Sequence, residues 1–214
     1  MTDTQTKELI RAVEEADSPA QLVAAVRALV AAEVEEGIPT LIAVLGYNNP
    51  VAAVAAVAGL TQLGRSAVQP LIEQLDEYNY GARAYSIRAL AAIADPRALD
   101  VLLTAVATDF APSVRRAAAK GLGTLCWSQV SAEERQSAQA RALQTLLSVS
   151  QDPDWSIRYA VVVGLQALAT TPNLFQPIQE HFEQMTDDAD LAVRARVQMA
   201  TQLQATAPAT AIDM

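Results

Sequence analysis

The sequence is poor in cysteine, histidine and aromatic residues. Cys126 and His181 are single occurrences. One cysteine excludes an internal disulfide and is typical of a reducing compartment. One cysteine and one histidine supply too few ligands for a zinc site, so we predict no metal site. No motif joins the two as a catalytic pair, and we expect Cys126 to be buried or inert and His181 to be exposed on a helix.

Positive charge and long apolar runs are also scarce. The formal net charge is −9, and no run of lysine or arginine offers a basic face to phosphates, which argues against nucleic-acid binding. Charges or prolines interrupt every apolar run before the roughly 18 residues that a membrane span needs. The polar, acidic N-terminus lacks a secretory signal pattern. We therefore expect a soluble cytoplasmic protein without membrane insertion.

Alanine, leucine and valine are abundant and occur in a repeating pattern. Five segments share one aligned position, which recurs at intervals of 30, 32, 43 and 36 residues and is held by Ala53, Arg83, Arg115, Arg158 and Arg194. Small or apolar side chains follow it three positions later, and leucine follows at seven in all but the last copy. This spacing describes one face of a helix. Second amphipathic segments, such as IPTLIAVL from Ile38, lie between the copies.

The helix starts carry capping signals. Ser18-Pro19 and Asp95-Pro96 each place an oxygen acceptor before a proline at the first helical position. Ser131 and Glu134 form a capping-box pattern, so the longest interval is expected to hold a prolonged second helix. No segment alternates long enough to predict a strand. We predict an all-α solenoid of helical hairpins (an α-α superhelix), with a single repeat domain over residues 1–204 and a flexible tail over 205–214.

Three of the repeated arginines have a polar residue four positions before them. These residues are Asn79, Asp154 and Asp190. We expect each to reach the guanidinium of Arg83, Arg158 or Arg194, which would stabilise the helix start and could bridge to the next repeat. These arginines can therefore be read as scaffold residues.

Aromatic residues gather beside two of the repeated arginines. The stretch YNYGARAYSIR, residues 78 to 88, holds three of the five tyrosines, and Trp155 and Tyr159 flank Arg158. Aromatic rings stack on flat ligands, and arginine pairs with carboxylates. We predict a binding surface for a flat, conjugated, negatively charged partner, formed by Tyr78, Tyr80, Arg83, Tyr85, Arg88, Trp155, Arg158 and Tyr159. The alternative is that these rings fill gaps between repeats.

Helix pairs at about 30-residue spacing resemble the HEAT-like repeats of phycobilisome lyases. The stretches GYNNPVAAVAAV, YNYGARAYSIRALAAIADPRALD and SVRRAAAKGLG resemble the beta (F) subunit of the heterodimeric E/F-type phycocyanobilin lyases, and the resemblance extends to about residue 203. It implies a cytoplasmic cyanobacterial protein that pairs with a homologous alpha (E) subunit. The pair attaches phycocyanobilin through a thioether to a cysteine of the phycocyanin alpha chain. Phycocyanobilin is then a substrate, and no cofactor is implied.

The same resemblance implies catalysis by positioning. The acceptor chain supplies the thiol and the bilin supplies the ethylidene group, so we assign no catalytic residue, and the eight residues above become candidate bilin-binding residues. Isomerising relatives carry a motif with histidine and cysteine where this sequence has Tyr78 to Arg83, so we expect attachment without isomerisation. The alternative is a non-catalytic HEAT-repeat chaperone or scaffold that binds phycobiliproteins for phycobilisome assembly or degradation.

Overall fold

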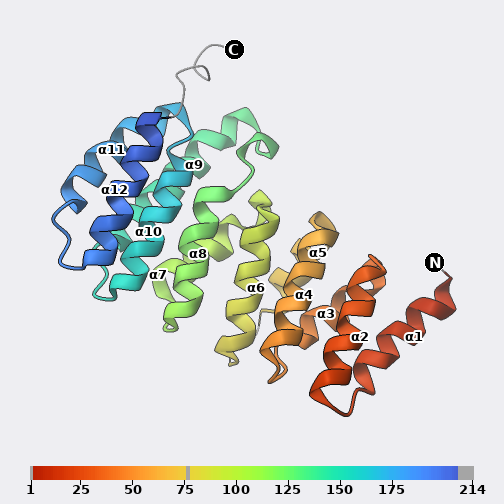
Figure 1. The fold of residues 1–214 in the computed structure, drawn as a ribbon. Coiled ribbons are helices and arrows are strands. Elements are labelled where there is room, and N and C mark those ends of the chain that lie inside the picture. Colours follow the sequence, from red (N-terminus) through yellow and green to blue (C-terminus); the bar gives the residue numbers. More distant parts are fainter. Residues whose placement is uncertain (1, 76–77, 207–214) are drawn as a thin grey trace. The chain divides into compact units, whose positions relative to one another are not determined.

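A computed structural model describes residues 2–75 and 78–206 of the chain. This part contains twelve α-helices, three short 3-10 helices and no β-strand (Figure 1). The chain divides into two compact units, Met1–Ala98 and Leu99–Met214. The first unit contains α1 (Asp3–Glu14), α2 (Pro19–Ala31), η1 (Glu35–Gly37), α3 (Ile38–Val44), α4 (Pro50–Leu63), α5 (Arg65–Glu73), α6 (Tyr80–Ile93) and η2 (Pro96–Ala98). The second contains α7 (Leu99–Thr108), α8 (Pro112–Thr124), η3 (Trp127–Gln129), α9 (Ala132–Val149), α10 (Trp155–Leu168), α11 (Pro172–Met185) and α12 (Leu191–Thr206).

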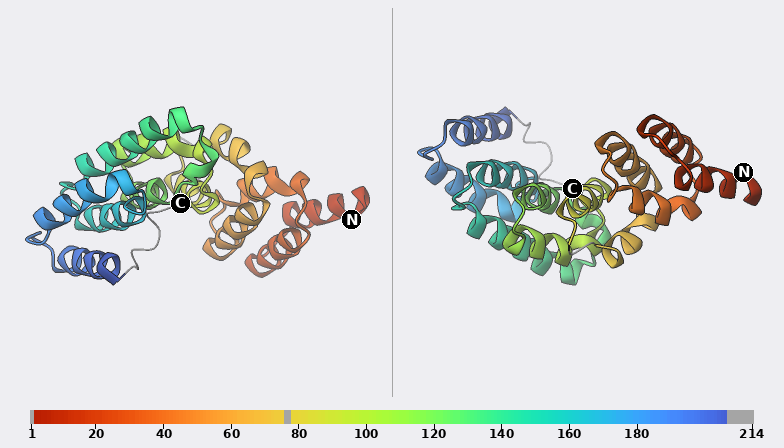
Figure 2. Two further views of the ribbon diagram at one scale, coloured as in Figure 1. Left: turned by 90° about the horizontal axis from the view of Figure 1, so that it is seen from above. Right: turned by 90° about the horizontal axis from the view of Figure 1, so that it is seen from below.

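In the first unit, consecutive helices pack as three hairpins. These are α1 with α2, α3 with α4, and α5 with α6. The second helices of the hairpins, α2, α4 and α6, lie side by side (Figures 1 and 2). Ala52, Ala53 and Ala56 of α4 are fully buried, because their small side chains let the neighbouring helices approach closely. The predicted solenoid of helical hairpins is therefore confirmed in this unit.

The second unit repeats this arrangement with α7 and α8, α9 and α10, and α11 and α12. Its second helices, α8, α10 and α12, lie side by side (Figure 2). The closest approach is between α8 and α10. A Cβ atom on Gly123 would lie 2.1 Å from the carbonyl oxygen of Gly164, and one on Gly164 would lie 2.2 Å from that of Ala119. Only glycine at both positions allows this packing.

Most of the predicted helix starts are confirmed. The hydroxyl of Ser18 accepts a hydrogen bond from the backbone N–H of Gln21 at 3.3 Å, and Pro19 begins α2. Ser131 caps α9, which is 18 residues long and takes up much of the longest repeat interval. Pro96 begins the 3-10 helix η2 instead of an α-helix, and α7 starts only at Leu99.

The domain prediction is not tested by this division into units. A solenoid makes its contacts between neighbouring repeats whether or not it folds as one domain, so the single domain over 1–204 stays a prediction. The predicted tail starts at residue 205, but α12 continues to Thr206, and residues 207–214 lie outside the described part of the chain. No helix among the described residues is long and apolar enough to cross a membrane.

Candidate functional site

Asn79 holds the start of α6 and ties it to the preceding repeat. Its side-chain oxygen accepts a hydrogen bond from the backbone N–H of Ala82 at 3.0 Å. Its side-chain nitrogen donates to the carbonyl oxygen of Gly46 at 3.4 Å. Asn49 has the same two roles at the start of α4, where it caps Ala52 and donates to the carbonyl oxygen of Pro19. Asn79 is therefore a scaffold residue that places the tyrosine stretch.

The tyrosines on either side of this cap are exposed. Tyr78 is 94% exposed and Tyr80, the first residue of α6, is 58% exposed. Tyr80 and Arg88 are eight positions apart, so they lie on one side of the helix. The guanidinium carbon of Arg88 lies 5.6 Å from the ring centroid of Tyr85, within the range of a cation–π contact. Helix α6 thus presents aromatic rings and a guanidinium on a partly open face, with Arg83 half-buried beside them.

A second group of aromatic and basic residues lies at the start of α10. Asp154 caps this helix, and its carboxylate accepts hydrogen bonds from the backbone N–H and the hydroxyl of Ser156 at 2.8 and 2.7 Å. Trp155 is 48% exposed, and Tyr159 follows it by four positions, on the same side of the helix. Arg116 reaches across from α8 and donates to the hydroxyl of Ser156 at 2.9 Å. Arg116 is not among the binding residues predicted from the sequence, although it occupies the repeat position that Tyr159 holds in the next copy.

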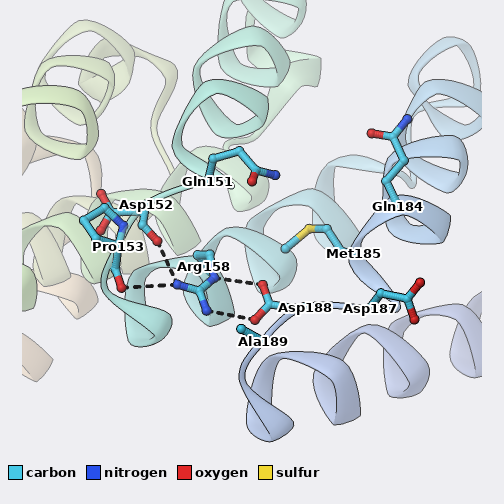
Figure 3. Close-up of a pocket in the computed structure, with 9 residues that line it drawn as sticks. All are labelled: Gln151, Asp152, Pro153, Arg158, Gln184, Met185, Asp187, Asp188 and Ala189. Atoms are coloured by element: carbon cyan, nitrogen blue, oxygen red, sulfur yellow. Dashed lines mark hydrogen bonds and ion pairs between the residues drawn. The ribbon is translucent and has the colours of Figure 1, made fainter.

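The guanidinium of Arg158 donates hydrogen bonds from all three of its nitrogen atoms. Its Nε and Nη2 atoms donate to the two carboxylate oxygens of Asp188 at 2.8 Å each, and Nη1 donates to the carbonyl oxygen of Asp152 at 2.8 Å (Figure 3). The hydrogen bond with Asp188 raises the pKa of Arg158, and the same contact lowers the pKa of Asp188. These contacts fit the scaffold alternative for Arg158. Its role in ligand binding stays a prediction.

The hollow beside Arg158 has a volume of about 390 Å³ and is lined by more acidic than basic side chains (Figure 3). Asp152, Asp187 and Asp188 contribute carboxylates to its wall, whereas Arg158 is the basic residue in it. An excess of carboxylates repels an anionic ligand. This hollow is therefore a poor place for the anionic partner that the sequence predicts.

The arginine of one repeat pairs with an aspartate of the next. Arg115 lies 2.6 Å from a carboxylate oxygen of Asp152, and Arg158 pairs with Asp188 in the following repeat. The expected contact between Arg158 and Asp154, four positions before it, is therefore wrong. Asp154 and Asp190 cap their own helices, at the backbone N–H groups of Ser156 and Ala192. An N-cap side chain turns toward the first helical turn, and this leaves the guanidinium for another carboxylate.

The predicted binding residues form two groups, one in each unit. Residues 78 to 88 belong to the first unit, and Trp155, Arg158 and Tyr159 belong to the second. Within its own unit, each group combines aromatic rings with arginine on a partly exposed helix start.

Two further side chains, Cys126 and His181, could in principle take part in chemistry. Cys126 is a free, partly exposed thiol whose sulfur lies 3.2 Å from the hydroxyl oxygen of Ser128. His181 is half-buried instead of exposed, and burial lowers its pKa. Within the residues that the structure describes, no group of three or more His, Cys, Asp and Glu side chains could hold a metal ion.

Comparison with known proteins identifies the family. A model of HEAT repeats matches residues 68–136. The chain is 60% identical over 196 residues to the phycocyanobilin lyase subunit beta of Nostoc sp. strain PCC 7120, a match that covers 91% of this chain and 98% of that protein. It is 48% identical over 190 residues to the phycocyanin alpha phycocyanobilin lyase CpcF of Synechocystis sp. strain PCC 6803, with 88% and 89% covered.

A solved structure agrees with these relatives. One chain in the complex of CpcE and CpcF of phycocyanin lyase from Nostoc sp. PCC7120 is 62% identical, with a TM-score of 0.76. The match covers 78% of this chain and 98% of that one. Both the sequence and the fold of the protein thus match the same group, and the chain belongs to the family of phycocyanobilin lyase beta subunits.

Proposed function

We propose that this chain, paired with a homologous alpha subunit, attaches phycocyanobilin through a thioether to a cysteine of the phycocyanin alpha chain. The observation that carries this function is the family membership, at 48–60% identity over most of the chain. The relative from Synechocystis is named for the phycocyanin alpha chain, and the similar Nostoc chain was solved in a complex with CpcE. These names support both the acceptor and the partner.

The exposed residues of α6 form the first part of the proposed bilin site. Tyr80 and Arg88 are exposed although the packing of the repeat does not need them, and no other copy carries a tyrosine and an arginine at both of these positions. Tyrosine rings stack on a conjugated tetrapyrrole, and a guanidinium pairs with its propionates. Tyr85, whose ring lies 5.6 Å from the guanidinium carbon of Arg88, and the neighbouring Tyr78 and Arg83 complete the proposed group.

Trp155 and Tyr159 of α10 form the second part. Their rings lie on the same side of the helix, and Arg116 reaches the hydroxyl of Ser156 between them. Arg116 is only partly buried, whereas Arg158 is occupied by Asp188 and two carbonyl oxygens. Arg116 is therefore the better-placed cation for a bilin propionate in this unit.

The proposed reaction requires positioning more than it requires a catalytic side chain. The acceptor thiol adds across the ethylidene double bond of the bilin, so that the C–S bond forms, the thiol proton ends on the bilin and no group leaves. Holding the tetrapyrrole in one conformation, with the double bond facing the thiol, lowers the entropic part of the barrier. Phycocyanobilin is a substrate in this scheme and not a resident cofactor.

Two further parts of the proposal concern the product and the location. Residues Tyr78 to Arg83 contain no histidine or cysteine, and a group that titrates near neutral pH is what moving protons along the bilin would need. We therefore propose attachment without isomerisation. The presence of only one cysteine in the sequence supports a cytoplasmic location, because disulfides are rare in a reducing compartment.

Co-expression tests the function. The chain, its alpha subunit, the phycocyanin alpha chain and phycocyanobilin are produced together, and the acceptor is then denatured and separated on a gel. Bilin fluorescence that remains with the denatured alpha chain, with the absorbance of phycocyanobilin, is the expected result. Omission of this chain should abolish the attachment.

Two other outcomes would contradict the proposal. Tight binding of the acceptor without covalent attachment would favour the chaperone or scaffold alternative. A product that absorbs as phycoviolobilin would refute attachment without isomerisation.

A further inference from the structure

Arg196 of α12 is the most deeply buried basic residue in the described part of the chain. It is 9% exposed, and the other arginine and lysine residues in the described part of the chain are more exposed. Its position, two after the repeated arginine, is held by Ala117 in α8 and Ala160 in α10. The last of these copies thus places a long, charged side chain where its neighbours carry a small one.

Among the described residues, no carboxylate pairs with the guanidinium of Arg196. Its Nη2 atom donates to the side-chain oxygen of Gln166 on α10. Its Nη1 atom is buried and has no hydrogen-bond partner among the described residues. Burial lowers the pKa of Arg196, and the nearby Tyr159 is the one group that offsets this effect. No carboxylate in the described part of the chain contributes to its electrostatics, in contrast to Arg97, Arg115 and Arg158, which each pair with an aspartate.

A buried guanidinium without a carboxylate is unfavourable, because both the charge and the unpaired N–H group lose their hydration. A bound water molecule would satisfy the N–H group but would not neutralise the charge. A carboxylate would do both, since guanidinium and carboxylate form charge-assisted hydrogen bonds. A ligand that supplies a carboxylate would therefore complete the arrangement.

We infer that Arg196, supported by Gln166 and next to Tyr159, anchors one propionate carboxylate of the bilin. Tyr159 and Trp155 lie on one side of α10, the helix that packs against α12, and offer aromatic rings to the flat tetrapyrrole beside the anchor. This inference rests on the proposed function, because it takes the carboxylate from the bilin. It adds a residue that lies outside the eight predicted from the sequence.

The test compares two forms of the ligand. Phycocyanobilin with free propionates and its dimethyl ester are titrated into the heterodimer, and binding is followed by bilin absorbance. The wild-type heterodimer should bind the free acid about ten- to a hundredfold more tightly, as expected for a charge-assisted hydrogen bond. Arg196→Met should reduce this preference by about tenfold or more, because the carboxylate loses its anchor. Arg194→Met, on the same helix two positions away, should keep the preference.

The stability of the variant is a second readout. Arg196→Met replaces an uncompensated buried charge with an apolar side chain, so its melting temperature should equal or exceed that of the wild type. Arg196→Lys keeps the charge but loses the planar fork, and it should show an intermediate preference. The lysine variant also keeps the test decisive if the methionine variant does not fold.

Three results would overturn the inference. If Arg196→Met and Arg196→Lys keep the full preference for the free acid, the anchor lies elsewhere, and bilin attachment by both variants would leave the proposed function intact. If Arg196→Met keeps the preference but dissociates from the alpha subunit, the carboxylate comes from the partner protein. If the wild-type heterodimer binds neither form of the bilin, the proposed function itself is wrong.

Discussion

Arg158 and Asp188 form a two-pronged ion pair that joins two successive repeats. Both contact distances are 2.8 Å, and the two side chains are only 13% and 9% exposed. The same arginine also donates to the carbonyl oxygen of Asp152, which precedes α10. A single guanidinium thus contacts the turn before its own helix and the turn between α11 and α12.

Arg158→Ala is expected to destabilise the chain by about 3–5 kcal/mol, because it leaves the buried carboxylate of Asp188 without its guanidinium partner. The free energy of unfolding in urea measures this effect. The matched control is Arg141→Ala, which breaks an ion pair with Asp100 whose side chains are 52% and 79% exposed. The control should cost less than about 1 kcal/mol, as exposed pairs do. Equal losses for both variants would contradict a structural role specific to Arg158.

Tyr80→Ala combined with Arg88→Ala is expected to reduce bilin transfer by about tenfold or more, since lost stacking and a lost charged hydrogen bond each contribute about 1–3 kcal/mol. Both side chains are exposed, so the melting temperature should change little. The rate of covalent attachment to the phycocyanin alpha chain is the measurement. Phe175→Ala removes an aromatic ring that is 41% exposed on α11 and should leave the rate unchanged. Full activity of the double variant would exclude the α6 surface as a bilin site.

Gly164→Ala is expected to destabilise the second unit by about 3 kcal/mol or more, because the new methyl group would overlap backbone atoms of α8. The overlap with the carbonyl oxygen of Ala119, at 2.2 Å, cannot be relieved by turning a side chain. Thermal unfolding by circular dichroism reports the loss. Gly46→Ala serves as the control, since its nearest contact would be an ordinary 3.5 Å, and its effect should stay within about 0.5 kcal/mol. A Gly164→Ala variant as stable as the control would mean that α8 and α10 pack less closely than described.

The stability of the chain is expected to fall in acid. Hydrogen bonds from Arg97 and Arg158 hold the pKa values of Asp95 and Asp188 below the usual 3.8. The unfolded chain therefore takes up these protons at a higher pH than the folded chain does. The stabilisation is complete above the unfolded pKa and is lost as the pH falls through the folded pKa values.

Unfolding free energies measured from pH 7 to pH 3 check this prediction. Asp95→Asn should be less stable than the wild type at pH 7 and should lose less stability in acid, so the two curves converge at low pH. Asp95 is 2% exposed and pairs with Arg97, so the substitution removes a buried charge from this pair. If the unfolding free energies of the wild type and Asp95→Asn ran parallel with pH, Asp95 would have the same pKa in the folded and the unfolded chain, and the prediction would be wrong.

The sequence by itself determined the class of fold. Apolar spacings of three, four and seven residues are a property of each helix alone, and the capping residues Ser18 and Ser131 act on N–H groups within three positions. Such local rules predict helices and their starts without knowledge of the packing. The aromatic residues around Arg83 and Arg158 could be found in the same way, as departures from the repeat.

Only the tertiary structure decided which basic side chains pair with a carboxylate of the chain and which do not. Arg158 pairs with Asp188, 30 positions away, and the nearer Asp154 is consumed as a helix cap. In the sequence, Arg196 looks like one more basic residue of the repeat, yet α12 packs against α10 and buries it away from every carboxylate of the described residues. The register between neighbouring repeats sets these partners, and it depends on close contacts such as that of Gly123 with Gly164, which no spacing within one helix encodes.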